Sequence, residues 1–278
     1  MIFRTLFAVI ILAFLAGCGG STPPRAMPGV DLHDRVLSAK AVRVGVKADT
    51  PPFGFREGDL WFGFDVEMAL MVFREMGIKD VVFVPVTSAN RIEKLRAGEV
   101  DCLFASMTIT RKREKSVDFS IPYFQDGQGL MVKSTSPVQS YLDLGSKRVG
   151  TVQGSTSADN MSQVAPDARI VPYADYQALF QALMTDKVDA ISSDSIILLG
   201  LAKAANASNG VRLAGGVFST EPYGIAVPEN QSRFRDAINE SLQRLWETGR
   251  WQQVYDTWFG PRSQFKVDTG FAITPFPH

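Results

Sequence analysis

The chain has 278 residues, of which 45% are hydrophobic and 21% are charged, as in an ordinary globular protein of one or two domains. Its 29 lysines and arginines are balanced by 29 aspartates and glutamates, so the formal net charge is zero. With no net positive charge and no long basic run, nucleic acid is not expected as a partner. Any site for an anion must therefore be local.

The first residues have the pattern of an export signal. Arg4 precedes an apolar run over residues 6–14, which is too short to span a bilayer. The sequence Leu-Ala-Gly-Cys follows at residues 15–18 and resembles a bacterial lipobox, whose cysteine becomes the acylated N-terminus. A plain secretory signal with an incidental cysteine is the alternative.

This pattern predicts a lipoprotein signal peptide over residues 1–17 and a linker over residues 18–39, anchored through a lipid on Cys18. The linker is rich in proline and glycine. The protein is then exported and held at the cell envelope, in the periplasm or on the outer face of the cytoplasmic membrane. We expect the folded body to begin near Lys40.

The remaining cysteine and the two histidines do not form a cluster in the sequence. Cys102 lies in an apolar run over residues 100–104, so a buried and unreactive thiol is expected, with no disulfide. His33 and His278 lie near the two ends of the chain. We therefore expect no zinc-type metal site, no Cys-His or Ser-His-Asp nucleophile, and no cofactor.

Strand and helix patterns alternate along the chain. Runs rich in β-branched residues predict strands over residues 42–46, 81–86 and 100–105. Helices are predicted between these strands, the second of them capped by Ser88 or Thr87. Such alternation is typical of an α/β protein with mainly parallel sheets.

One segment of this pattern occurs twice. Residues 95–104 run from a helix end through a tight turn to Val-Asp and a buried strand, and residues 183–192 do the same. Because the pattern occurs only twice, it predicts two similar lobes and not a solenoid. Residues 223–227 are predicted to form a strand that returns to the first lobe, and helices are predicted over residues 232–248 and 250–258.

Polar and cationic residues follow three successive predicted strands. Lys47 follows the first strand, Ser88 and Arg91 follow the second, and Ser106 and Thr108 follow the third. Ligands of parallel sheets bind beyond the carboxyl ends of the strands. Three strand ends are therefore expected to direct polar groups toward one crevice.

Two predicted helix starts carry arginine, in the segments 87–91 and 110–113. A helix N-terminus has partial positive charge, so an arginine there is disfavoured by up to ~1 kcal/mol. Both placements are reasonable if the helix starts face an anion.

Nine short motifs spread over residues 42–260 carry a family resemblance. They are Val-Gly-Val-Lys-Ala-Asp-Thr-Pro-Pro-Phe (44–53), Gly-Phe-Asp-Val-Glu (63–67), Ala-Gly-Glu-Val-Asp (97–101), Met-Thr-Ile-Thr-Arg-Lys-Arg (107–113), Val-Asp-Phe-Ser (117–120), Pro-Tyr (122–123), Gly-Ser-Thr (154–156), Tyr-Gly-Ile-Ala (223–226) and Trp-Phe-Gly (258–260). The chain thereby resembles the bacterial family 3 extracellular solute-binding proteins, the amino-acid receptors of ABC importers. The resemblance implies a type II periplasmic-binding-protein fold, in which two α/β lobes, joined by two crossover strands, close on a ligand.

The same resemblance implies how the chain divides into lobes. The first lobe is expected to comprise residues 40–131 and 227–260, and the second lobe residues 132–226. Residues 261–278 are expected to form a C-terminal tail.

The resemblance also implies which residues bind the amino-acid group of a ligand. Arg113 matches the arginine that binds the α-carboxylate, and a guanidinium group can donate two parallel hydrogen bonds to it. Ser106, Thr108 and Thr156 match further donors, and Asp194 matches the acid that pairs with the α-ammonium. The plainer alternatives are a solvated helix arginine and, for Asp194, a helix cap.

The residues expected around the ligand's side chain depart from the general family pattern. Members for neutral or basic amino acids usually have aspartate where this chain has Lys47, and an aromatic residue where it has Thr50. Lys47 and the Thr-Ser-Ala-Asn-Arg motif instead resemble the aspartate/glutamate-binding branch. In that branch, residues matching Lys47, Ser88 and Arg91 surround the side-chain carboxylate, and Tyr176 matches a nearby polar contact.

The charge balance of this predicted cleft favours an acidic ligand. Arg113, Arg91 and Lys47 against Asp194 leave two positive charges, whereas an amino acid with an acidic side chain carries one negative charge. A neutral amino acid would leave Arg91 and Lys47 without a partner, at a cost of several kcal/mol if they are buried. The alternative is that Lys47 lies at the rim and only raises the local potential.

The sequence therefore predicts a lipid-anchored, monomeric receptor that delivers glutamate or aspartate to an ABC permease without making or breaking a bond. A cyclohexadienyl (prephenate/arogenate) dehydratase-like enzyme is the alternative, because such enzymes share the fold and bind a dicarboxylate. Glu221 would then be the candidate general acid. A sensor or cell-wall enzyme domain ranks last, because the folded body is expected to end near Gly260.

Overall fold

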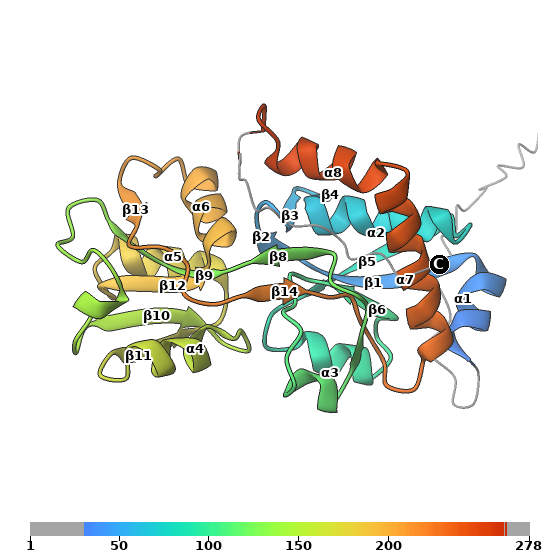
Figure 1. Ribbon diagram of the computed structural model, residues 1–278, viewed down its shortest axis with the longest axis horizontal. Coiled ribbons are helices and arrows are strands. Elements are labelled where there is room, and N and C mark those ends of the chain that lie inside the picture. The colour runs from blue at the N-terminus through green and yellow to red at the C-terminus, as the bar shows by residue number, and fades with distance from the viewer. Residues whose placement is uncertain (1–30, 264, 266–278) are drawn as a thin grey trace, which may run out of the picture.

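The computed structural model describes residues 31–263 and 265, and in this part of the chain two five-stranded sheets lie at opposite ends of the molecule (Figure 1). The predicted signal peptide, the lipobox with Cys18, and most of the predicted tail lie outside the described residues. Among the helices that are described, none is both long enough and apolar enough to cross a membrane.

The two sheets have equivalent strand orders, β5-β1-β6-β15-β7 and β11-β10-β12-β9-β13. In each sheet the first three strands are parallel and the fourth is antiparallel to its neighbours. The predicted α/β class with two similar lobes is therefore confirmed. The strands of the first sheet are β1 (Ala41–Lys47), β5 (Asp80–Val86), β6 (Cys102–Phe104), β7 (Asp118–Phe119) and β15 (Ala226–Val227). Those of the second are β9 (Gln128–Lys133), β10 (Arg148–Val152), β11 (Arg169–Tyr173), β12 (Ala190–Asp194) and β13 (Val211–Leu213).

Two antiparallel segments connect the lobes. The chain passes to the second lobe through β8 (Phe124–Asp126) and returns through β14 (Glu221–Tyr223), and these strands pair with each other between the sheets (Figure 1). Because β9 begins at Gln128, residues 128–131 pair within the second sheet, although the sequence placed them in the first lobe. Both crossover strands are thus present. The first of them, β8, ends at Asp126, whereas the predicted boundary between the lobes was residue 131.

Helices cover both faces of each sheet. Those of the first lobe are α1 (Leu32–Ala39), α2 (Phe64–Glu75), α3 (Arg91–Arg96), α7 (Ser232–Glu247) and α8 (Arg250–Phe259), with a 3₁₀ turn η1 (Arg113–Lys115). Those of the second are α4 (Ser157–Val164), α5 (Tyr176–Met184) and α6 (Ser195–Ala204), with a 3₁₀ turn η2 (Tyr141–Asp143). A small sheet of β2 (Asp49–Thr50), β3 (Gly54–Glu57) and β4 (Leu60–Phe62) follows β1.

Several local predictions were wrong. The basic segment after Thr110 forms only the 3₁₀ turn η1 and not a helix. Helix α6, the small sheet β2–β3–β4 and strand β13 were not predicted. Helix α6 is apolar on almost all sides, because it is packed between α5, β9 and β12, so its sequence has no clear helical periodicity.

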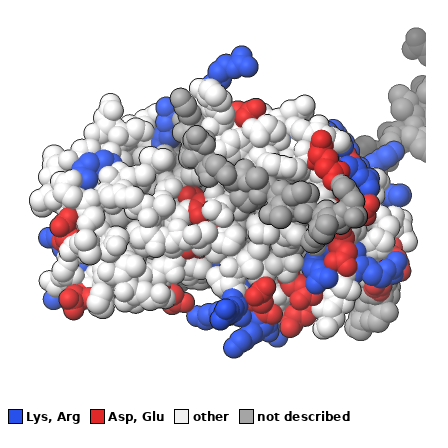
Figure 2. All heavy atoms as spheres, in the orientation of Figure 1, with Lys and Arg blue, Asp and Glu red and all other residues white. Residues whose placement is uncertain are grey.

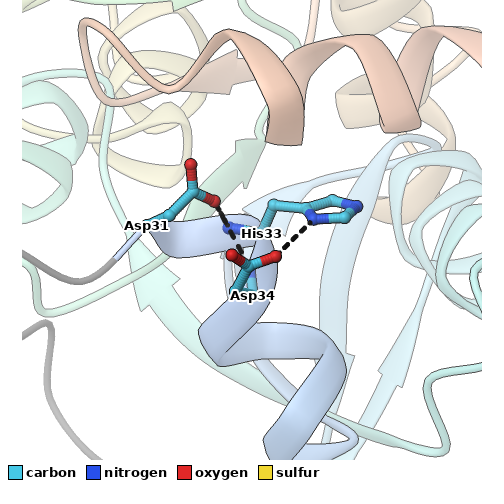
Figure 3. Close-up of side chains that lie close together, drawn as sticks. All are labelled: Asp31, His33 and Asp34. Carbon is cyan, nitrogen blue, oxygen red and sulfur yellow. Dashed lines mark hydrogen bonds and ion pairs between the residues drawn. The ribbon is translucent and has the colours of Figure 1, made fainter.

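Helix α1 lies in a segment that the sequence assigned to the linker. Its N-cap Asp31 accepts the backbone N–H groups of His33 and Asp34, and the His33 ring lies 3.2 Å from the Asp34 carboxylate (Figure 3). Arg233 of α7 donates to Asp34 at 2.8 Å, and Gln231 accepts the N–H of Leu32 at 2.9 Å. Capping and these bonds account for the close approach of the Asp31, His33 and Asp34 side chains. Because α1 packs on α7, the folded body begins about ten residues earlier than expected.

An aromatic cluster joins the crossover strands to the C-terminal helix. Phe53 lies 5.1 Å from Phe124 of β8 and 5.2 Å from Tyr223 of β14, measured between ring centroids. Phe259 at the end of α8 lies 5.0 Å from Phe124. All four rings are buried. The edge-to-face contacts of Phe53 and the tilted contact of Phe259 fix relative orientation as well as burying apolar area, so the crossovers leave the first lobe in a defined direction.

Cys102 lies in the centre of the first sheet. It is fully buried as predicted, and burial raises the pKa of its thiol well above the ordinary value. A thiol that does not ionise is a poor nucleophile, which agrees with a packing role.

The repeated Val-Asp pattern has the same structural role in both lobes. Asp101 accepts the backbone N–H of Arg43 at 2.8 Å and its guanidinium at 2.6 Å, and it also pairs with Arg35. Asp189 accepts the backbone N–H of Arg148 at 2.8 Å and its guanidinium at 2.8 Å. Each aspartate therefore ties the start of its strand to a neighbouring parallel strand, β6 to β1 in the first sheet and β12 to β10 in the second. The two sites differ in exposure, which is 1% for the Asp101 side chain and 37% for Asp189.

This difference predicts unequal effects of the same substitution. Asp101→Asn should lower the free energy of unfolding by about 3 kcal/mol, because it removes the buried carboxylate that pairs with Arg43 and Arg35. Asp189→Asn should lower it by less than ~1 kcal/mol, because solvent screens that pair. Urea unfolding of the two variants measures both values, and equal losses would contradict the assignment.

Candidate functional site

The nine residues predicted to bind a ligand line one small cavity between the lobes. The first lobe contributes six of them and the second lobe three. They are Lys47, Ser88, Arg91, Ser106, Thr108 and Arg113 on one side, and Thr156, Tyr176 and Asp194 on the other. The structure thus brings together every predicted site residue, and their roles toward a ligand stay predictions.

The parallel sheets place these residues at the cavity. Lys47 is the last residue of β1, and Ser88 and Arg91 follow β5. Ser106 follows β6, and Asp194 is the last residue of β12 in the other lobe. The carboxyl ends of both sheets therefore meet at the cavity, as expected for open α/β sheets.

Arg91 is buried with neutral partners only. Its Nη1 donates to the carbonyl oxygens of Ala105 at 2.5 Å and Ser106 at 3.5 Å, while its Nε has no partner among the described residues. Burial lowers the pKa of Arg91, and the charge of Arg113 lowers it further. The guanidinium stays charged at neutral pH, because its lowered pKa is still about 9. The site thus holds a desolvated cation with a free donor.

The helix that carries Arg91 begins differently from the prediction. The N-cap of α3 is Asn90, whose side chain accepts the N–H of Thr87 at 2.8 Å, and the Thr87 hydroxyl accepts the N–H of Asn90. Neither Thr87 nor Ser88 is the cap. Ser88 is therefore available for the cavity, where its Oγ accepts from the Lys47 Nζ at 3.1 Å.

Lys47 is the second buried cation of the cavity, and only 2% of the residue is exposed. Its ammonium lies 4.5 Å from the centre of the Tyr176 ring, within range of a cation–π contact. Burial lowers the pKa of Lys47 to about 8, against the opposing charge of Asp49. The rim position considered from the sequence is therefore wrong.

Arg113 spans the two lobes. Its Nη1 donates to the Thr108 carbonyl at 2.7 Å within the first lobe, and its Nη2 donates to the Gly154 carbonyl at 3.1 Å in the second. Burial lowers its pKa, although the carboxylates of Asp194 and Glu221 act in the opposite direction. No carboxylate of the described residues lies within 4 Å of either Arg91 or Arg113.

Among the described residues, Asp194 is the single acid that lines the cavity. It occupies the N-cap position of α6 but makes no side-chain capping bond, so the plain capping alternative does not hold. It accepts a short hydrogen bond from the hydroxyl of Tyr223. Burial, and then the charges of Asp126 and Glu221, raise the pKa of Asp194 well above its ordinary value. A cation placed beside it would favour its ionised form.

Thr156 and Glu221 form a pair behind the cavity wall. The Thr156 hydroxyl donates to Glu221 at 3.1 Å, and Asn160 and Ser219 donate to the same carboxylate at 2.7 Å each. Glu221 does not line the cavity. The Glu221 carboxylate therefore orients the hydroxyl of Thr156. The hydroxyl of Tyr176 is held in a similar way by the hydroxyl of Ser193 at 3.2 Å.

Asp65 is a supporting residue whose role was not recognised in the sequence. It is fully buried, and it accepts the N–H of Ser106 at 2.8 Å, the Ser106 hydroxyl at 3.1 Å and the Tyr123 hydroxyl at 2.6 Å. Ser106 has a φ of 45°, which a side chain of this kind rarely adopts without support. Asp65 thus holds the loop whose carbonyls bind Arg91. The Gly-Phe-Asp motif contained this residue but gave no indication of its partner.

The lobes are in close contact around the cavity. Gly154 has a φ of 76°, and a Cβ at this position would lie 2.7 Å from the Cα of Ala89 in the other lobe. Tyr176 donates its backbone N–H across the same gap to Asp49 at 3.0 Å. The structure is therefore a closed form in which side chains of both lobes enclose the cavity.

Two α/β lobes that close through a pair of crossover strands over a small charged cavity define a two-lobed ligand-binding protein. The chain belongs to the bacterial extracellular solute-binding proteins, family 3, whose family model matches residues 42–261. It is 36% identical to the ABC transporter glutamine-binding protein of Bacillus subtilis, over 91% of this chain and 94% of that protein. The glutamate-binding protein of Corynebacterium efficiens is 30% identical, over 94% of this chain and 93% of that protein. A solved ancestral arginine-binding protein bound to glutamine is similar with a TM-score of 0.75 and 37% identity, over 80% of this chain and 98% of that chain.

The buried ammonium of Lys47 should cost stability in the ligand-free protein. Below pH about 8 the group is charged in both the folded and the unfolded state, so the folded state bears the full cost of burial. Between pH about 8 and 10.5, the ordinary pKa of lysine, Lys47 is deprotonated in the folded state but still protonated in the unfolded state. The free energy of unfolding therefore rises with pH in this range.

Lys47→Met should therefore raise the free energy of unfolding at pH 7 by on the order of 2–3 kcal/mol, and this gain should disappear above pH 10.5. Denaturant unfolding at pH 7 and pH 11 measures the change. Lys112→Met, at an exposed rim lysine, is the control and should have little effect at either pH. A gain at Lys47 that does not depend on pH would contradict the electrostatic origin.

Proposed function

We propose that the protein is the substrate-binding component of an ABC importer and that it binds an acidic amino acid, glutamate or aspartate, between its closing lobes. One observation carries the proposal: three buried cations and one carboxylate line the cavity, and two of the cations have only neutral partners. Such a cavity is completed by a ligand that has two carboxylates and one ammonium group.

The amino-acid group of the ligand fits one end of the cavity. Arg113 presents a guanidinium fork toward the cavity from the first lobe, and we assign it to the α-carboxylate together with Thr108 and Thr156. Asp194 is the only acid among the described residues of the lining, and we assign it to the α-ammonium. Because Arg113 and Asp194 come from different lobes, a bound amino acid bridges the lobes and favours closure.

The side chain of the ligand then meets Lys47 and Arg91. Ser88 and Tyr176 stand beside Lys47, and Ser106 lies beside Arg91. Three cations against Asp194 leave two net positive charges, and a ligand of charge −1 reduces this to one. A neutral amino acid would leave Arg91 desolvated without a counter-charge, at a cost of several kcal/mol, and would leave Lys47 with only Asp49 at 3.8 Å.

The relatives support an amino-acid ligand and leave its side chain open. One relative is named for glutamine and another for glutamate, and these ligands have the same shape but differ in one charge. We rest the choice of an acidic side chain on the buried cations of this chain. This positive charge is local, since Figure 2 shows acidic and basic side chains lying next to one another over the first lobe.

We further propose that the receptor is a monomeric lipoprotein, exported and anchored at the cell envelope through Cys18, that docks on an ABC permease. The lipobox at residues 15–18 supports the anchor. Catalysis is not proposed, because the candidate general acid Glu221 does not line the cavity and its carboxylate accepts hydrogen bonds from Thr156, Asn160 and Ser219.

A panel of ligands tests the proposal directly. Isothermal titration calorimetry of the protein should give micromolar or tighter dissociation constants for glutamate or aspartate, and weaker binding of glutamine, histidine and arginine. Preferential binding of a neutral or basic amino acid would refute the acidic assignment. Turnover of prephenate or arogenate to an aromatic product would instead support the dehydratase alternative.

Arg91 should be essential for the acidic ligand. Arg91→Met should weaken glutamate binding by about 2 kcal/mol or more, roughly thirtyfold or greater, because a buried carboxylate loses its cation. Arg111→Met is the matched control, since Arg111 is exposed and outside the cavity, and it should leave the dissociation constant unchanged. Equal effects of the two variants would show that net charge and not the cavity governs binding.

A further inference from the structure

Asp49 stands directly behind the cation that we assign to the ligand's side chain. It is the first residue of β2, two positions after Lys47, and its Oδ1 lies 3.8 Å from the Lys47 Nζ. Asp49 does not line the ligand cavity but lines a larger cavity on the other side, next to α5 and α6. Lys47 therefore lies between a ligand on one side and a carboxylate of the protein on the other.

Hydrogen bonds from both lobes fix this carboxylate. Its Oδ1 accepts from the hydroxyl of Thr50 at 2.9 Å in the first lobe. Its Oδ2 accepts the backbone N–H of Tyr176, the first residue of α5 in the second lobe, at 3.0 Å. The N-terminus of a helix attracts negative charge, so the closed form holds Asp49 in place beside Lys47.

The three cations of the cavity differ in how far the protein neutralises them. Arg91 and Arg113 donate to main-chain carbonyls, which carry no net charge. Lys47 has two neutral neighbours, Ser88 and the ring of Tyr176, and in addition the carboxylate of Asp49 at ion-pair distance. The side chain of Lys47 is 3% exposed and that of Asp49 is 28% exposed, so the pair is only partly screened by water.

We propose that Asp49 is a specificity-determining residue, which sets how strongly the receptor favours a side-chain carboxylate over a side-chain amide by partly neutralising Lys47. The inference rests on the proposed function, since it assigns Lys47 to the ligand's side chain. A ligand carboxylate beside Lys47 is repelled by Asp49, whereas an uncharged amide is not. With Asp49 present, an amide side chain also leaves Lys47 with a counter-charge.

Removal of the Asp49 charge should therefore sharpen the preference for the acid. Asp49→Asn retains an oxygen that can accept the N–H of Tyr176, so closure is retained while the charge is lost. If Asp49 served closure alone, its substitution would weaken glutamate and glutamine binding by the same factor. The ratio of the two dissociation constants separates these roles.

The experiment measures the dissociation constants of glutamate and glutamine for the wild-type protein, Asp49→Asn, Lys47→Met and the double variant, at pH 7. The ratio of the glutamine constant to the glutamate constant should rise about tenfold in Asp49→Asn. In the Lys47→Met background the same change should leave the ratio within about twofold, because the two residues act through one contact.

Asp175→Asn is the matched control. Asp175 is the N-cap of α5 and accepts the N–H of Ala178 at 2.7 Å. Asp175→Asn therefore removes one negative charge at the same helix terminus, as Asp49→Asn does. This variant should leave the ratio unchanged. Asp49→Ser provides a second uncharged side chain with an acceptor oxygen, should Asp49→Asn not fold.

The outcomes are distinct. An unchanged ratio in both Asp49 variants, or an equal rise in the Lys47→Met background, would overturn the role of Asp49 and leave the proposed function intact. A rise in Asp175→Asn equal to that in Asp49→Asn would also overturn it, because any nearby charge would then suffice. If the wild-type protein does not bind glutamate or aspartate, the proposed function fails, and the role of Asp49 fails with it.

Discussion

Positive charge enclosed between two lobes is the constraint on which the rest of this structure depends. Arg91, Arg113 and Lys47 are each less than 10% exposed, and water is therefore not available to solvate them fully. Main-chain carbonyls replace part of that solvation but cancel none of the charge. Burial of an unpaired cation costs several kcal/mol, so the closed form without an anion is disfavoured. An anion that enters the cavity removes this cost, and closure and anion binding then favour each other.

A second set of residues holds the groups of the cavity in place. Asp65 fixes the strained loop at Ser106, Glu221 orients the hydroxyl of Thr156, and Tyr223 donates to Asp194. These supports are hydrogen-bonded and almost entirely buried, so their geometry is defined by packing and not by a ligand. A preformed arrangement loses less entropy on binding, which fits the ligand-binding role that we propose.

The sequence was sufficient for features that depend on local pattern. Periodicity placed the strands, and the rule that parallel strands present ligand groups at their carboxyl ends placed Lys47, Arg91 and Ser106 at one cavity. It was insufficient where tertiary packing decides. Helix α1 is short and follows a segment rich in proline and glycine, and its stability depends on contacts with α7 that lie about 200 residues away. Similarly, nothing in a linear reading shows that Asp65 reaches Ser106.

The difference between glutamate and glutamine is a single charge on side chains of equal size, so shape cannot separate them. Every amino acid presents the same α-carboxylate and α-ammonium, so Arg113 and Asp194, in the roles that we propose for them, contribute affinity without selecting a side chain. In the proposed binding mode, selection comes from the charge balance at the other end of the cavity, where Lys47 pairs with Asp49 and Arg91 pairs with no acid of the described residues. A cation that is partly neutralised by the protein gives a graded preference for a ligand carboxylate over an amide. A cation without a protein counter-charge gives a strict preference for the carboxylate. The end of the cavity that we assign to the ligand's side chain contains a cation of each kind, Lys47 and Arg91. Its selectivity is therefore a balance that substitutions outside the cavity can shift.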